Sequence, residues 1–177
     1  MENIILVINE LELKRKEINI SRESIEFISL ICKILKPENI LEIGTFNGYS
    51  SLWLALFAKK VFTLEIDIFI ARIAKENFKK AKCENIKLIE GDALENLKKI
   101  NKKFDIILID AKKSEYKDYL NLVLNLISEE SLIFVDNTIS HKEKLKEFFD
   151  YLKNSSLYYK ELNLGKGLMV ISNKVLF

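Results

Sequence analysis

The sequence predicts an α/β fold in which helices cover both faces of a mostly parallel sheet. Short apolar runs of strand length recur along the 177 residues, and stretches with the spacing of amphipathic helices lie between them. The runs are mostly continuous and rich in Ile, Val and Phe, which is typical of strands buried on both faces. This alternation favours parallel strands joined by right-handed crossovers.

The strands follow one another at regular intervals. We expect them at residues 40–43, 61–66, 86–90, 104–109 and 131–135 (ILEI, VFTLEI, IKLIE, FDIILI and SLIFV). The final segment, LYYKELNLGKGLMVIS, predicts two more strands joined by Gly165, Lys166 and Gly167. This hairpin is expected to close the sheet in antiparallel orientation.

Helices are expected before the first strand and between the later ones. Residues 1–36 form the expected N-terminal helical segment, in which Ser21 marks a helix start. Helical spacing continues over residues 68–81, 116–124 and 145–152. Ser114, and Ser140 with Glu143 in capping-box spacing, predict the starts of the last two.

Composition indicates one globular domain spanning residues 1–177, with 49% hydrophobic and 31% charged residues. No apolar run approaches the roughly 20 residues that a membrane span requires, so no membrane partner is expected. Cys32 and Cys83 fit neither a disulfide framework nor a zinc site, which favours a reducing cytoplasm. The net charge is +2, and the lysine pairs are scattered, which favours a solvated surface over a nucleic-acid stripe.

Two of the five glycines, Gly44 and Gly48, bracket the turn after the first core strand. Glycine leaves room for a ligand against the main chain, and the next helix offers free N–H groups to a carboxylate. The G-x-x-x-G spacing differs from the G-x-G-x-x-G of dinucleotide enzymes, which argues against a nicotinamide dehydrogenase. Glu65, at the end of the second strand, could accept hydrogen bonds from ribose hydroxyls, and Asp92 follows the third strand at the expected level of an adenine. Together with the glycine pair, these acids favour an adenosyl ligand over residues that serve only to form turns.

A second group of polar residues follows two later strands. Asp110 ends one strand, and Asp136 and Asn137 end the next, so their side chains are expected to converge at one edge of the sheet. An all-oxygen set of this kind suits Mg²⁺ or another divalent cation. Lys113 is a candidate general base, because a neighbouring cation disfavours a protonated lysine. The sole histidine, His141, is read as a solvated residue in the first turn of a helix.

These segments together resemble the cation-dependent O-methyltransferases, the family of catechol and caffeoyl-CoA O-methyltransferases and bacterial tRNA hydroxyuridine methyltransferases. The resemblance extends from residue 21 to residue 173. It is carried by LEIGTFNGYSS, TLEID, IEGDAL, FDIILIDAKKSEY, FVDN and LGKGLMV. It implies a Rossmann-like, seven-stranded class I fold that binds S-adenosylmethionine (SAM).

The resemblance also implies roles for individual residues. Lys113 and Asp110 are the catalytic candidates, and Asp110, Asp136 and Asn137 are the metal ligands. The expected cofactor residues are Glu42, Gly44, Phe46, Gly48, Tyr49, Ser50, Glu65, Ile66, Asp92, Ala93 and Asp110. Lys166 stands where many relatives have aspartate, and the segment after Asn137 lacks their longer loop; both regions shape the acceptor pocket.

The expected function is therefore cation-dependent transfer of a methyl group from SAM to a hydroxyl of a small catechol-like or diol acceptor. Two alternatives stay open: a tRNA hydroxyuridine methyltransferase, which the scattered lysines do not indicate, and a non-catalytic SAM-binding module. A homodimer also stays open as a partner.

Overall fold

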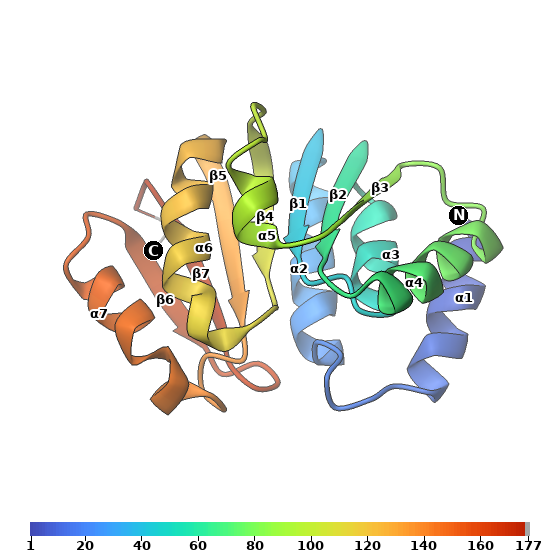
Figure 1. Cartoon of the computed structure of the whole chain (residues 1–177), viewed down its shortest axis with the longest axis horizontal. Coiled ribbons are helices and arrows are strands. Elements are labelled where there is room, and N and C mark those ends of the chain that lie inside the picture. Colours follow the sequence, from blue (N-terminus) through green and yellow to red (C-terminus); the bar gives the residue numbers. More distant parts are fainter. Residues whose placement is uncertain (176–177) are drawn as a thin grey trace.

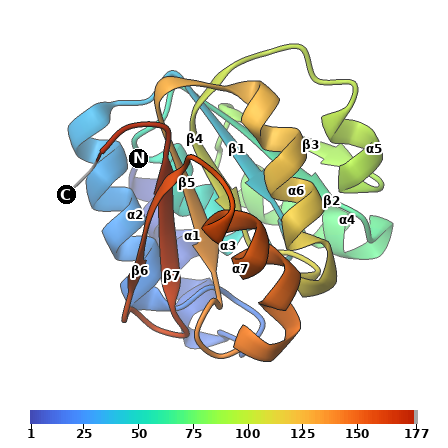
Figure 2. The same cartoon turned by 90° about the vertical axis from the view of Figure 1, so that its left-hand side faces the viewer.

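The computed structural model describes residues 1–175 and contains a seven-stranded sheet with the order β3-β2-β1-β4-β5-β7-β6 (Figure 1). Strands β1 to β5 pair in parallel, whereas β7 pairs antiparallel with β5 and β6. The strands are β1 Asn39–Ile43, β2 Lys60–Glu65, β3 Ile86–Glu90, β4 Phe104–Ile109, β5 Ile127–Asp136, β6 Tyr158–Leu162 and β7 Leu168–Ser172. The predicted sheet and its closing hairpin are confirmed, and Figure 2 shows β6 and β7 beside β5.

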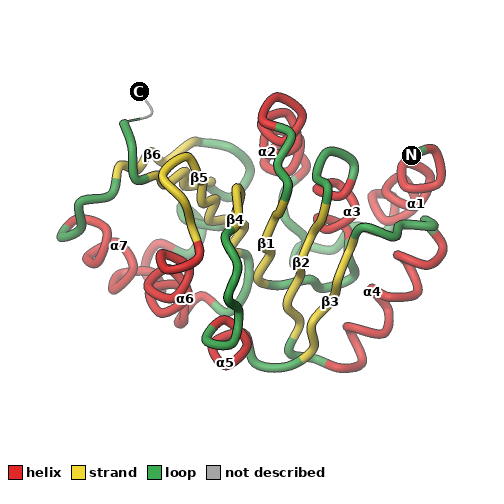
Figure 3. The backbone as a smooth tube through the Cα atoms, turned by 90° about the horizontal axis from the view of Figure 1, so that it is seen from above, coloured by secondary structure: helices red, strands yellow, loops and turns green. Residues whose placement is uncertain are grey.

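Helices pack on both faces of the sheet, as predicted. They are α1 Glu2–Leu13, α2 Arg22–Leu35, α3 Tyr49–Ala55, α4 Ile68–Lys80, α5 Ala93–Leu97, α6 Tyr116–Val123 and α7 Lys146–Lys153. Figure 3 separates α1, α2 and α3 on one side from α5, α6 and α7 on the other. Apolar residues of α1 to α4 share one core with the sheet, and those of α5 to α7 share the second. Within residues 1–175, no helix combines the length and apolar character needed to cross a membrane.

Three strands differ from their expected bounds, β1 only by beginning one residue earlier, at Asn39. Strand β5 begins at Ile127 and not at residue 131, because Ile127 pairs with Phe104 before the register between β4 and β5 shifts. The polar residues at 128–130 concealed this extension. Strand β2 ends at Glu65, so that Ile66 lies outside the strand and is 70% exposed.

Of the three predicted helix starts, one is confirmed. The Ser21 side chain caps α2 by accepting a hydrogen bond of 3.1 Å from the Ser24 amide. Ser114 lies inside a 3-10 turn, and α6 begins two residues later without a side-chain cap. Ser140 does not begin α7 either, because a 3-10 turn over Lys142–Leu145 comes first. Its hydroxyl contacts the ring of His141 instead of an amide of the helix.

Candidate active site

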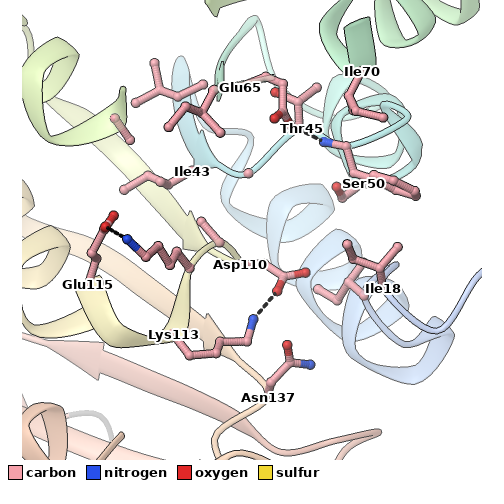
Figure 4. A pocket seen from close by; sticks show the side chains of 18 of the residues that line it. Ile18, Ile43, Thr45, Ser50, Glu65, Ile70, Asp110, Lys113, Glu115 and Asn137 are labelled. Atoms are coloured by element: carbon pink, nitrogen blue, oxygen red, sulfur yellow. Dashed lines mark hydrogen bonds and ion pairs between the residues drawn. The ribbon is translucent and has the colours of Figure 1, made fainter. Parts of the chain in front are cut away.

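A cavity of about 960 Å³ opens at the carboxyl ends of the parallel strands (Figure 4). The strand order puts the turn after β1 and the ends of β2 and β3 on one side of it. The ends of β4 and β5 and the β6–β7 turn lie on the other side. The loop between α1 and α2 contributes residues 17–20 to the wall, and Figure 4 shows Ile18 across from Asp110. The cavity therefore lies where ligands bind in open α/β sheets.

The glycine turn after β1 is closely packed against the end of the neighbouring strand β4 and against helix α4. Gly44 has φ +101°, and a Cβ atom there would lie 2.0 Å from the backbone oxygen of Asp110. Gly48 has φ +84° and begins α3, and a Cβ atom there would lie 2.4 Å from the Phe78 ring. Side chains at either position would collide, so glycine is required for packing as well as for conformation.

Glu65, at the end of β2, faces the cavity with its carboxylate fixed by backbone amides. One oxygen accepts a hydrogen bond of 2.8 Å from the Phe46 amide, and the other accepts one of 3.0 Å from the Asp67 amide. Phe46, with φ +48°, thereby ties the glycine turn to β2. Each carboxylate oxygen keeps a further lone pair for a hydroxyl donor.

Glu42 lies in the middle of β1 and is fully buried. Its Oε2 accepts hydrogen bonds from the hydroxyls of Ser51 and Thr63, the latter at 2.6 Å, and Thr63 also pairs with Thr45 at 2.6 Å. Burial raises the pKa of Glu42 to about 7, although the hydroxyl donors oppose the shift. Because Thr45 lines the cavity, this network links the interior of β1 to the cavity wall.

Asp110 and Lys113 form an ion pair at the end of β4. Lys113 Nζ donates to Asp110 Oδ1 at 2.9 Å and to the Tyr116 hydroxyl at 2.7 Å. The Tyr116 hydroxyl donates in turn to the backbone oxygen of Asp136 at 3.3 Å. Both members of the ion pair are mostly buried, with side-chain exposures of 14% and 16%. The lysine is thus held at the cavity wall by two neighbours from the same short segment.

Asp136 and Asn137 end β5 beside this ion pair. Asp136 is fully buried; its Oδ2 accepts a hydrogen bond of 2.6 Å from the Asn137 amide, and its Oδ1 has no hydrogen-bond partner in the described chain. Burial raises the pKa of Asp136 to about 7; the nearby Asp110 carboxylate also raises it, and the Lys113 ammonium lowers it. Figure 4 shows Asp110, Lys113 and Asn137 converging from three directions.

The oxygen set fits a hard divalent cation. A buried carboxylate oxygen without a partner is costly unless it gains a ligand or a proton. Among residues 1–175, no group of three or more His, Cys, Asp or Glu side chains could hold a metal ion. A cation here would therefore need the amide oxygen of Asn137 besides the carboxylates of Asp110 and Asp136.

Most residues predicted for the cofactor site line the cavity. These are Gly44, Phe46, Ser50, Glu65, Ile66, Asp92, Ala93 and Asp110. Glu42 and Tyr49 are instead buried, where Tyr49 donates a hydrogen bond to Glu12, and Gly48 packs against Phe78. Of the predicted metal ligands, Asp110 and Asn137 line the cavity, and Asp136 lies buried next to them. The roles of all these residues stay predictions.

Several residues of the cavity wall were not anticipated. His141 does not lie in the first turn of a helix; it lies half-buried in the loop after β5 and lines the cavity. Ile18 also lines it, and Tyr116 supports Lys113. Lys166, in a region that the resemblance implies shapes the acceptor pocket, lines the cavity as well. One signal pointed to Tyr116, its place three residues after Lys113, but its helical spacing indicated a core residue only.

The family model for O-methyltransferase matches residues 5–173. The chain belongs to this O-methyltransferase family. A catechol O-methyltransferase of Niastella koreensis is 33% identical over 138 residues, which are 73% of this chain and 62% of that protein. The O-methyltransferase ankF of Aspergillus thermomutatus is 40% identical over 112 residues, 59% of this chain and 47% of that protein. The chain thus spans about half to two thirds of the length of these curated relatives.

Solved structures agree in fold. An SAH-bound methyltransferase of Podospora anserina superposes with a TM-score of 0.88 at 24% identity, covering 99% of this chain and 89% of that one. An O-methyltransferase of Bacillus cereus in complex with SAH has a TM-score of 0.80 at 26% identity, covering 98% and 90%. The fold is that of class I SAM-dependent methyltransferases.

Proposed function

We propose that this chain is a SAM-dependent O-methyltransferase that uses Mg²⁺ or another divalent cation to methylate a small catechol-like or diol acceptor. One observation carries the proposal. Asp110, Lys113 and Asn137 meet at the cavity wall, beside the glycine turn and next to the partnerless oxygen of Asp136. Acceptor hydroxyls that reach this point would contact oxygen ligands and a proton acceptor together.

The cofactor would occupy the side of the cavity formed by the ends of β1, β2 and β3. Gly44 and Ser50 would contact its methionine part, Glu65 its ribose hydroxyls, and Asp92 and Ala93 its adenine. When bound, SAM supplies an electrophilic methyl group on its sulfonium. The Bacillus cereus and Podospora anserina relatives were solved with SAH, which supports this choice of ligand.

The residues of this chain would supply proton transfer and positioning. Asp110, Asp136 and Asn137 would hold the cation, which acts as a Lewis acid that makes an acceptor hydroxyl more acidic. In this proposal Lys113 would release its ammonium proton to solvent when Asp110 binds the cation, and its neutral amine would then accept the hydroxyl proton, with Tyr116 fixing its position. The cavity walls would hold nucleophile and methyl group in line, which in general lowers a barrier by about 7–11 kcal/mol.

The test measures transfer of a labelled methyl group from SAM to catechol and, separately, to total tRNA, with Mg²⁺ and with a chelator. We expect transfer to catechol that Mg²⁺ stimulates. Asp136→Asn should remove the stimulation, while calorimetry should still detect SAH binding. Asp118→Asn, at an exposed position of α6, is the matched control and should keep full activity.

Three results would contradict the proposal in different ways. Equal transfer in chelator would remove the role of the cation. Transfer to tRNA alone would replace the small acceptor by a nucleic acid. Binding of SAH without transfer to any acceptor would favour a non-catalytic binding module.

A further inference from the structure

The cavity has a second end, away from the proposed cofactor, that is built around the turn between β6 and β7. A Cβ atom on Gly165 would lie 1.9 Å from the Ser21 hydroxyl, and one on Gly167 would lie 2.4 Å from the Ile139 amide nitrogen. Both glycines have positive φ. The turn is therefore tightly seated between the start of α2 and the loop after β5, and the backbone of Lys166 is fixed between them.

Lys166 joins three parts of the wall. Its backbone oxygen accepts hydrogen bonds from the amides of Ile139 and Ser140 at 3.1 and 3.0 Å. Its Nζ donates to the backbone oxygen of Glu17 at 2.6 Å, in the loop between α1 and α2. The backbone of Lys166 is thus bonded to the loop after β5, which presents Asn137, and its ammonium reaches across to residues 17–20, which line the cavity.

The positive charge of Lys166 at this end of the cavity is not balanced by an ion pair with any described residue. In the part of the chain that the structure describes, neither Lys166 nor His141 has a carboxylate oxygen within 4.0 Å, whereas Lys113 is paired with Asp110. The Lys166 ammonium is therefore available to pair with an anionic ligand.

One acidic side chain also lines this end. Glu17 is exposed, and its carboxylate forms no ion pair with Lys166 within residues 1–175; only its backbone oxygen is bonded. The lysine thus retains two donor hydrogens and its full charge for a ligand. Removal of the Glu17 charge would make the electrostatic potential at this end of the cavity more positive. It would not change the hydrogen bond between Lys166 Nζ and the Glu17 backbone oxygen.

We propose that this end of the cavity binds an anionic group of the methyl acceptor, with Lys166 as its charged partner and His141 beside it. The inference rests on the proposed function and narrows its substrate class. The acceptor would be a dihydroxylated molecule that carries a carboxylate or a similar anion, and its hydroxyls would lie toward Asp110 and Lys113. A charge-assisted hydrogen bond of this kind distinguishes anionic from neutral acceptors of the same shape.

The test compares 3,4-dihydroxybenzoate with 3,4-dihydroxybenzamide, which has nearly the same shape and no charge. The full chain should show a higher kcat/KM for the acid. Lys166→Gln should lower the acid-to-amide ratio of kcat/KM about 10-fold or more, the usual range for loss of a charged hydrogen bond. Lys166→Arg should keep the ratio, and Glu17→Gln should raise it. Thermal unfolding of each variant checks that the hairpin remains folded.

The outcomes separate this inference from the proposed function. Methylation of both acceptors with no preference for the acid, or an equal loss for both in Lys166→Gln, would overturn the inference and leave the O-methyltransferase in place. If the full chain methylates neither acceptor, calorimetry with 3,4-dihydroxybenzoate decides. Tighter binding to the full chain than to Lys166→Gln would support the anion site, and equal or absent binding would refute it.

Discussion

Gly44→Ala tests how closely the glycine turn and the end of β4 depend on each other. The new Cβ atom would lie 2.0 Å from the backbone oxygen of Asp110 and 2.9 Å from its carbonyl carbon. These atoms cannot rotate away, because the Asp110 amide is hydrogen-bonded to Ile43 at 3.0 Å. The strand ends must therefore separate at the point where Asp110 faces the cavity.

Gly91→Ala is the matched control. Gly91 has φ +108°, close to the +101° of Gly44, but the nearest atom to its new Cβ would be Asn96 Nδ2 at 3.5 Å. Both variants incur backbone strain of about 1–3 kcal/mol. Only Gly44→Ala adds overpacking, about 1–3 kcal/mol in a well-packed site.

Thermal unfolding followed by circular dichroism measures the difference. A difference of about 2 kcal/mol in a protein of this size corresponds to a Tm about 4–8 °C lower for Gly44→Ala than for Gly91→Ala. Equal Tm values for the two variants would show that the contact between Gly44 and Asp110 does not constrain the strand ends. The close packing described for this turn would then be wrong.

Three further substitutions test the Ser21 cap of α2, the support that Tyr116 gives Lys113, and the buried carboxyl of Glu42. Ser21→Ala removes the cap of α2 and should lower the free energy of unfolding by about 1 kcal/mol, measured by urea titration. Tyr116→Phe removes a hydroxyl that holds Lys113 Nζ at 2.7 Å, so kcat for methyl transfer should fall while the ring stays packed. Burial raises the pKa of Glu42 from 4.5 to about 7, so the protonated form stabilises the fold most below about pH 4.5, and that contribution is lost as the pH rises to about 7. Relative to Glu42→Gln, the natural chain should lose unfolding free energy on the order of 3 kcal/mol between pH 4.5 and pH 8.

Each of these changes has its own control. Ser114→Ala should leave stability unchanged, because Ser114 is exposed and caps no helix. Tyr151→Phe removes a hydroxyl from α7, away from Lys113, and should leave kcat unchanged. For Glu42, a parallel pH dependence of the natural chain and the glutamine variant would show that this carboxyl does not titrate in the folded state.

Residues in regular elements were predictable because their environment is local. A strand such as 104–109 is buried on both faces from Ile106 onward, so these positions are apolar, and the end of the run fixes where Asp110 stands. The same reasoning put Asp136 beside it, since parallel strands end at one edge of the sheet. Helix starts in loops were less predictable. At Ser140, backbone hydrogen bonds from residues 138–140 to the β6–β7 turn hold the chain in a turn and delay α7.

The order of strands and helices along the chain, the glycine turn and the polar residues at the strand ends could be predicted from the amino-acid sequence, because they follow from spacing within short segments. The three-dimensional packing places Glu42 and Tyr49 in the interior and His141 at the cavity wall. It also brought Lys166 against Glu17, 149 positions away in the chain. Contacts of this kind depend on how distant loops pack across the sheet, and no local pattern of side chains encodes that packing.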